Sequence, residues 1–203
     1  MNILQGDSLQ LLKTFKDKEF DYFLTSPPFK EEEFGGDDYW NNMDAIIGEL
    51  RRITSKAGFM FQSSTKQIQM IRRYEDIIRV LIWAKQPSNT AYRYEPIFVW
   101  QFGDFKINRY LFKDVWVIPA VLHSNFDPAP MRKKWTNAGH PSYENPLRLY
   151  KQLLQMLPKG KVIDPFLGTG TTTNACRMLG HECVGIEIDP AKPCFRKGLE
   201  VFG

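Results

Sequence analysis

The segment Val162–Ala175, VIDPFLGTGTTTNA, decides the fold. Its apolar start predicts a buried strand, its glycines predict a turn, and TTTNA predicts the beginning of a helix. Gly168 and Gly170 permit the positive φ angles of such a turn and let a ligand approach the backbone closely. Taken alone, the turn is equally consistent with a tight connection that binds nothing. The segment therefore predicts one strand–turn–helix unit of an α/β protein.

Apolar strands alternate with helices along the rest of the chain, which has 203 residues. This alternation predicts a single domain with a mostly parallel sheet and helices on both faces. The expected strands are 2–7, 20–26, 58–64, 81–86, 94–102, 161–166 and 182–189. The expected helical segments are 8–15, 42–54, 68–81, 146–157, 171–180 and 190–202. Residues 103–139 show no clear period and are expected to be irregular.

An acidic residue follows the glycine turn at a spacing typical of nucleoside sites. Glu187 ends the next expected strand, 17 positions after Gly170. A carboxylate in this place commonly accepts both ribose hydroxyls of a nucleoside. Thr173 stands where the dinucleotide fingerprint has its third glycine, and the loop lacks the lysine of a P-loop. Together with Asp164, at the end of its own strand, Glu187 predicts a site for a nucleoside cofactor without phosphates.

A second loop follows the expected strand 20–26 and begins Pro27-Pro28-Phe29. Prolines fix φ at about −65° and donate no backbone hydrogen bond, so this loop is stiff and its carbonyl groups are open to a partner. The alternative is that the prolines only end the strand and Phe29 packs in the core. The acidic segment KEEEFGGDDYW comes next, and we interpret it as a flap over a substrate, with Tyr39 or Trp40 as a stacking residue.

With both loops in view, the chain resembles the S-adenosylmethionine-dependent DNA amino-methyltransferases, which methylate the exocyclic amine of cytosine or adenine. The resemblance covers nearly the entire chain. It rests on DPFLGTGTT for the cofactor, TSPPF for catalysis, Gly6-Asp7, Glu187, and HPSYENPLRLYKQLL from His140. The catalytic motif precedes the cofactor motif, as in the circularly permuted beta arrangement of the family. The family fold is a Rossmann-like sheet of seven strands, mostly parallel with one reversed strand.

The resemblance implies a role for each matching residue. Ser26 and Pro27 would accept the hydrogens of the amine, and Phe29 would stack on a base turned out of the duplex. Asp7 would lie beside the cofactor's adenine and His140 near its methionine end. The implied catalytic residues are Ser26, Pro27, Pro28 and Phe29. The implied cofactor-binding residues are Asp7, Asp164, Phe166, Gly168, Thr169, Gly170, Thr171, Glu187 and His140.

The resemblance also bears on the target base. Within the family, a serine before Pro-Pro favours cytosine N4, whereas aspartate or asparagine favours adenine N6. Ser26 therefore predicts N4-methylcytosine, with adenine N6 or an RNA substrate as the alternatives. A catalytically idle nucleic-acid-binding subunit with the same fold is a third alternative. An NAD-linked oxidoreductase is disfavoured because Thr173 replaces the third glycine.

Contacts with double-stranded DNA are expected in the short segment 103–139, where the family usually inserts its recognition region. The sequence MRKKW in this segment combines three cations with an indole that can stack on a base. The predicted nucleic-acid-binding residues are Arg132, Lys133, Lys134 and Trp135. The shortness of the segment implies a short or relaxed target sequence, or specificity supplied by a second copy of the chain or by a separate subunit.

Composition sets the remaining bounds. The chain is 43% hydrophobic and 25% charged, which is typical of globular proteins, and its net charge of +4 mildly favours a polyanionic partner. No apolar run approaches ~18 residues and the first ten residues do not form a signal peptide. We therefore expect a cytoplasmic prokaryotic or viral protein without a membrane partner. Cys176, Cys183 and Cys194 lack CxxC spacing, and His123 and His140 have no second ligand at metal spacing, so we expect buried thiols and no metal site.

Overall fold

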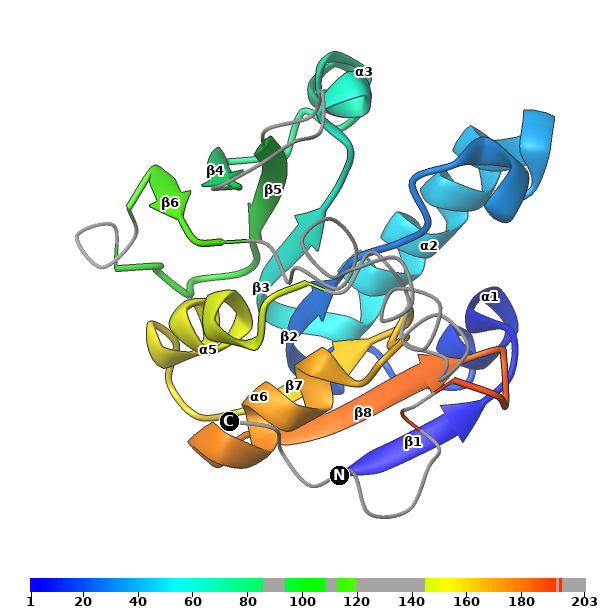
Figure 1. Ribbon diagram of the computed structural model, residues 1–203. Helices are drawn as coiled ribbons and strands as arrows, with labels where there is room; N and C mark the ends of the chain where they lie inside the picture. Colours follow the sequence, from blue (N-terminus) through cyan, green and yellow to red (C-terminus); the bar gives the residue numbers. More distant parts are fainter. Residues whose placement is uncertain (86–93, 109–112, 120–144, 193, 195–203) are drawn as a thin grey trace, which may run out of the picture.

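The computed structural model describes residues 1–85, 94–108, 113–119, 145–192 and 194. Its strands form one eight-stranded sheet in the order β1-β8-β7-β2-β3-β5-β4-β6 (Figure 1). The strands are β1 Asn2–Gln5, β2 Phe20–Thr25, β3 Thr54–Phe61, β4 Arg79–Ala84, β5 Tyr94–Gln101, β6 Val115–Val117, β7 Lys161–Asp164 and β8 Glu182–Glu187. β5 is antiparallel to β3 and β4, and the other described pairs are parallel. The prediction of a mostly parallel sheet with one reversed strand is confirmed.

Several element bounds differ from the prediction, and two of its details are plainly wrong. Among the described residues the sheet has eight strands rather than seven, because β6 forms inside the segment that was expected to be irregular and pairs with β4. The helix expected at 68–81 ends at Arg73, and Arg79 already belongs to β4. The apolar, partly β-branched run after Asp76 suits a strand that pairs on both sides, and pairing with β5 and β6 outweighs the helical spacing.

Helices cover both faces of the sheet, as predicted. The described helices are α1 Ser8–Leu12, α2 Tyr39–Ile53, α3 Gln67–Arg73, α5 Leu147–Gln155 and α6 Thr171–Leu179, with the short 3₁₀ helices η1 Glu31–Glu33, η2 Gly36–Asp38 and η3 Ser64–Lys66. Buried residues of α1, α2 and α3 share one core cluster, and those of α5 and α6 share the other. Neighbouring residues of β2 separate accordingly, since Leu24 belongs to the α5 side and Phe23 to the α2 side.

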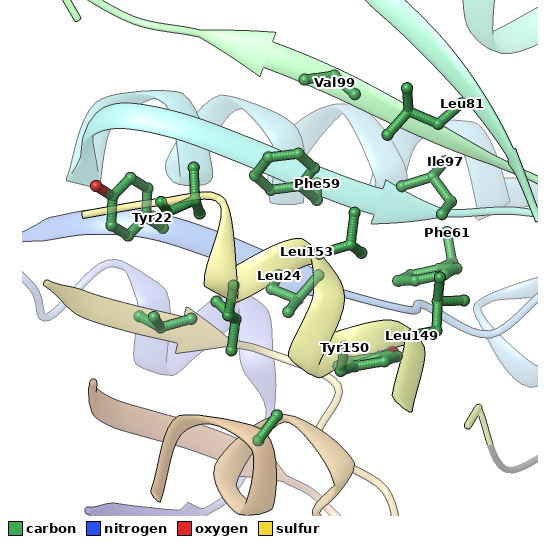
Figure 2. Packing of buried hydrophobic residues seen from close by; sticks show 14 of the residues in the cluster. Tyr22, Leu24, Phe59, Phe61, Leu81, Ile97, Val99, Leu149, Tyr150 and Leu153 are labelled. Carbon is green, nitrogen blue, oxygen red and sulfur yellow. The ribbon is translucent and has the colours of Figure 1, made fainter. Parts of the chain in front are cut away.

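The core under α5 is rich in aromatic rings, and Figure 2 shows Leu149, Tyr150 and Leu153 of this helix facing the strands. The rings of Tyr150 and Phe61 are stacked, with centroids 5.1 Å apart and an interplanar angle of 2°. This contact holds the beginning of α5 against the end of β3, next to the edge of the sheet where β3 gives way to Gln62.

The topology creates a switch point between β7 and β2, which are parallel neighbours at the centre of the sheet. The chain leaves β7 through α6 on one face and leaves β2 through α2 on the other. In open α/β sheets, ligands bind where the connections diverge in this way, outside the carboxyl ends of the strands. The loops after β2 and β7, which carry the two sequence motifs, leave the sheet at this edge.

Gly58 of β3 is required by close packing inside the sheet. A Cβ atom at this position would lie 2.0 Å from two ring atoms of Phe23. Overpacking of this kind costs ~1–3 kcal/mol, and a clash with a buried ring belongs at the upper end of that range. We expect Gly58→Ala to lower the free energy of unfolding by about 3 kcal/mol in chemical denaturation. Gly48→Ala in α2, where a Cβ atom meets nothing within 4 Å, is the control and should raise it by about 1 kcal/mol.

Candidate functional site

The two motif loops are joined by a hydrogen bond between buried side chains. Thr25, at the end of β2, donates its hydroxyl hydrogen to Oδ1 of Asp164, at the end of β7, over 2.7 Å. The same carboxylate oxygen accepts the backbone N–H of Phe166 at 3.0 Å, and Oδ2 accepts the hydroxyl of Thr172. Asp164 therefore connects Thr25, which precedes Ser26, to both ends of the glycine turn through hydrogen bonds. The two loops open at one edge of the sheet, as a shared site requires.

Asp164 is a buried carboxyl group with a perturbed pKa. Burial raises the pKa to about 6, although the hydrogen bonds from Thr172, Thr25 and Phe166 oppose the rise. Between about pH 4 and pH 6 the folded protein keeps this proton, whereas the unfolded chain has released it. The free energy of unfolding therefore falls as the pH rises through that window. At neutral pH, where Asp164 is ionised, its burial lowers the free energy of unfolding by on the order of 3 kcal/mol. Its presence at the switch point is better explained by function than by stability.

The glycine turn has the conformation that the sequence predicts. Gly168 and Gly170 have φ angles of +56° and +92°, in the left-handed region. The buried Glu187 at the end of β8 receives two backbone hydrogen bonds, from the N–H of Gly168 to Oε2 at 2.8 Å and from the N–H of Asp189 to Oε1 at 2.9 Å. Each carboxylate oxygen can accept more than one hydrogen bond, so Glu187 can still bind a pair of hydroxyl groups.

The remaining residues of this motif lie where the turn meets the helix. Phe166, Gly168 and Thr169 are half-buried, and Thr171 is the first residue of α6 and is buried. The hydroxyl groups of Thr169 and Thr171 are 3.2 Å apart. All of the predicted residues of the glycine loop are thus brought together around the end of β7.

The loop after β1 lies against the same turn. The backbone N–H of Gly6 donates to the carbonyl oxygen of Glu187 at 3.0 Å, and Ser8 donates its hydroxyl hydrogen to the carbonyl oxygen of Pro165. Asp7, between them, accepts the backbone N–H of Gln10 and caps α1. The sequence analysis named Asp7 as a cofactor-binding residue, which stays a prediction, and it missed the supporting residues Ser8, Thr25 and Thr172. The position of each beside a predicted site residue is a signal that could have revealed it.

The loop Ser26–Phe29 begins at the switch point. Ser26 is half-buried, Pro27 is buried, and Pro28 accepts a hydrogen bond at its carbonyl oxygen from the hydroxyl of Tyr39 at 3.3 Å. Phe29 is half-buried against the core cluster on the α5 side, so packing accounts for part of its role, as in the alternative that the sequence left open.

Tyr39 is only 1% exposed, so of the two predicted stacking residues Tyr39 is wrong, and Trp40 stays a prediction. Its ring belongs to the core cluster on the α2 side, while Trp40 is half-buried beside it. The sequence analysis included Tyr39 in a flap because acidic residues and glycines precede it. In the structure it is the first residue of α2, and helix packing buries it.

Several predicted residues lie outside the described part of the chain. These are His140, Arg132, Lys133, Lys134 and Trp135, together with most of the expected helix 190–202. The three cysteines are free and buried, as predicted. Among the described residues there is no cluster of histidine, cysteine or acidic residues suited to a metal ion. In the same residues no helix is long and apolar enough to cross a bilayer.

The structure is that of an α/β protein in which a glycine turn lies next to a proline loop at the switch point of the sheet. A family model described as DNA methylase, N6_N4_Mtase, matches residues 20–192. The chain therefore belongs to this family and is a DNA methyltransferase of the N4-cytosine/N6-adenine type.

Individual relatives agree with this assignment. The type II methyltransferase M.ScaI of Streptomyces caespitosus is 26% identical over 92% of this chain and 76% of its own length. Among solved structures, the PvuII DNA methyltransferase (cytosine-N4-specific) has a TM-score of 0.73 at 15% identity, covering 94% of this chain and 83% of that chain. TTHA0409 of Thermus thermophilus, complexed with S-adenosyl-L-methionine, has a TM-score of 0.68 at 19% identity. The match covers 94% of this chain and 89% of that chain. At these identities the structural matches establish the shared Rossmann-like fold.

Proposed function

We propose that this protein transfers a methyl group from S-adenosylmethionine to N4 of cytosine in double-stranded DNA. The observation that carries the proposal is the hydrogen bond from Thr25 to Asp164, which holds the Ser26–Phe29 loop beside the glycine turn. A cofactor in the turn and a base at the proline loop would then lie side by side at one edge of the sheet.

The residues of the glycine turn fit this cofactor. Gly168, where an added Cβ atom would meet only the carbonyl oxygen of Phe166 at 4.0 Å, leaves the backbone open to close approach. Glu187 offers oxygen acceptors to the ribose hydroxyls. The buried Asp164 suits a cationic ligand rather than a phosphate. When bound, S-adenosylmethionine would supply an electrophilic methyl group on its sulfonium and would leave as the neutral thioether, while the methylated amine would release one hydrogen as a proton to solvent.

The proline loop would activate the amine by orientation. The lone pair of an exocyclic amine is delocalised into the ring, so the nitrogen is a weak nucleophile. The hydroxyl of Ser26 and the carbonyl of Ser26 or Pro27 would accept its two hydrogens and direct the lone pair towards the methyl group. The same oxygens stabilise the positive charge that develops on nitrogen. Phe29 would stack on the base after it has left the duplex.

The choice of cytosine rests on Ser26, and the second candidate is methylation of adenine N6. Nucleoside mass spectrometry of DNA incubated with the protein and S-adenosylmethionine distinguishes them. We expect N4-methylcytosine. N6-methyladenine would overturn the choice of base, and DNA without any methylated nucleoside would favour an idle nucleic-acid-binding subunit. Sequence specificity from a second copy of the chain or a separate subunit remains part of the proposal, as does DNA contact through Arg132–Trp135.

The raised pKa of Asp164 predicts how cofactor affinity depends on pH. The carboxyl group is mostly neutral below its pKa of about 6, whereas a cationic ligand favours the ionised form. Affinity for S-adenosylmethionine should therefore rise as the pH increases from 5 to 7, by up to about tenfold, and then level off. Isothermal titration at several pH values checks this. The Asp164→Asn variant should bind S-adenosylmethionine more weakly, and its affinity should hardly change with pH. If the affinity of this variant still rises with pH, another group causes the pH dependence.

A further inference from the structure

Residues 31–40 follow the proline loop in the sequence, and their aromatic side chains contact both the proline loop and the glycine turn. Phe34 lies edge-on to Phe166 of the glycine turn, with ring centroids 5.4 Å apart. It also lies edge-on to Tyr39, at 5.7 Å. Tyr39 in turn donates its hydroxyl hydrogen to the carbonyl of Pro28. A continuous path of side-chain contacts therefore connects the glycine turn to the proline loop.

The direction of the hydrogen bond to Pro28 is fixed by Gln62, a buried residue just after β3. Its side-chain oxygen accepts the backbone N–H of Ser63 at 2.8 Å, which orients the amide so that Nε2 donates to the Tyr39 hydroxyl, also at 2.8 Å. The single hydroxyl hydrogen of Tyr39 is then left for Pro28. Burial raises the pKa of Tyr39 to about 12, so this hydrogen is retained at neutral pH.

The segment itself is anchored to the body of the protein. Lys66, which is 7% exposed, pairs with Glu31 at 2.7 Å and lies 4.3 Å from the centroid of the Tyr39 ring. Asn42 of α2 donates to the carbonyl of Phe34 at 3.3 Å. These contacts hold Phe34 between the rings of Phe166 and Tyr39.

We propose that Phe34 and Tyr39 are positioning residues that couple the two loops, so that a cofactor held at Phe166 sets the proline loop for the target base. The inference rests on the proposed function. The hydrogen bond occupies the carbonyl of Pro28 and leaves those of Ser26 and Pro27 for the amine. Its length of 3.3 Å exceeds the usual ~2.7–2.8 Å for two oxygens, which leaves room for it to shorten when the site is filled.

The first test removes only the hydroxyl that reaches Pro28. In single-turnover assays with saturating cofactor and DNA, Tyr39→Phe should lower the rate of methyl transfer about tenfold, which is the effect of one hydrogen bond. Its Kd for S-adenosylmethionine should stay within about twofold of wild type because the ring contact with Phe34 remains. Tyr74→Phe is the matched control, since Tyr74 is buried in the same core cluster and donates to Asp44 at 2.8 Å, away from both loops.

Both tyrosine variants should lose comparable thermal stability, and only Tyr39→Phe should lose turnover. If the two variants transfer methyl groups at the same rate, the role of Tyr39 is only structural and the proposal is overturned.

The second test addresses Phe34 with a readout that needs no catalysis. Phe34→Ala should weaken S-adenosylmethionine binding in isothermal titration by about three- to tenfold, because Phe166 loses its edge-on partner. The double variant with Tyr39→Phe should transfer methyl groups no more slowly than Phe34→Ala alone, since both act through one path. Multiplicative losses, or unchanged cofactor affinity in Phe34→Ala, would overturn the coupling. A wild-type protein that binds the cofactor without methylating DNA would overturn the proposed function, and the titration would still decide whether Phe34 supports the cofactor turn.

Discussion

Glu187→Ala should weaken the binding of S-adenosylmethionine by about two to four orders of magnitude. Hydrogen bonds to a charged group contribute about 1.5–3 kcal/mol each, and the proposed ribose contact has two of them. The alanine variant also frees the N–H groups of Gly168 and Asp189, which Glu187 holds in the present structure. The glycine turn would then have to be ordered by the ligand, and this adds to the loss. Isothermal titration with S-adenosylmethionine measures the effect directly.

Two further variants isolate the carboxylate from the fold. Glu182→Ala removes an exposed glutamate at the other end of β8 and should bind the cofactor as the wild type does. Glu187→Gln keeps an oxygen acceptor for one backbone N–H and should lie between wild type and alanine in affinity. A Kd for Glu187→Ala within about threefold of wild type, with thermal stability retained, would show that ribose is bound elsewhere.

The sequence predicts the strands near the site well because their signals are local. The short apolar runs at 161–166 and 182–189, bounded by glycine, proline or charge, contain the parallel strands β7 and β8, although each strand ends two residues earlier than expected. The turn between them needs Gly168 and Gly170 at positive φ, so its conformation can be read from residue type alone. The carboxylates at the strand ends follow from the rule that strand ends of a parallel sheet meet at one edge.

Other features depend on contacts between distant parts of the chain. Gln62 belongs to an apolar run that gives no sign of a polar function, and its role appears only when Tyr39 lies beside it. The sequence analysis likewise named Tyr39 as one of two stacking candidates in a flap, whereas burial in the α2 core cluster decides its position. Residues 77–84 show that pairing with a neighbouring strand can outweigh helical spacing. These errors share one cause, which is that tertiary packing selects among conformations that local sequence allows.

Ser26→Ala should lower the single-turnover rate of methyl transfer by about 10²–10³-fold, the range found when one preorganised donor or acceptor is removed from a developing charge. The proposed role of Ser26 is to accept a hydrogen of the amine, and alanine cannot replace that acceptor. The loop has little freedom to compensate, because Thr25 is fixed to Asp164 on one side and Pro27 and Pro28 restrict the backbone on the other. Single-turnover assays are needed because product release can otherwise mask the chemical step.

The same variant should bind S-adenosylmethionine with a Kd within about twofold of wild type, because the contacts of the glycine turn do not include the Ser26 side chain. Ser55→Ala is the matched control: Ser55 is also half-buried, and it donates to the carbonyl of Phe20 at 3.0 Å at the opposite end of the sheet. Its rate should match wild type. Parallel losses of rate and cofactor affinity in Ser26→Ala would indicate a disordered loop rather than a missing acceptor. An unchanged rate would mean that backbone carbonyls alone orient the amine, and serine would then carry no information about the target base.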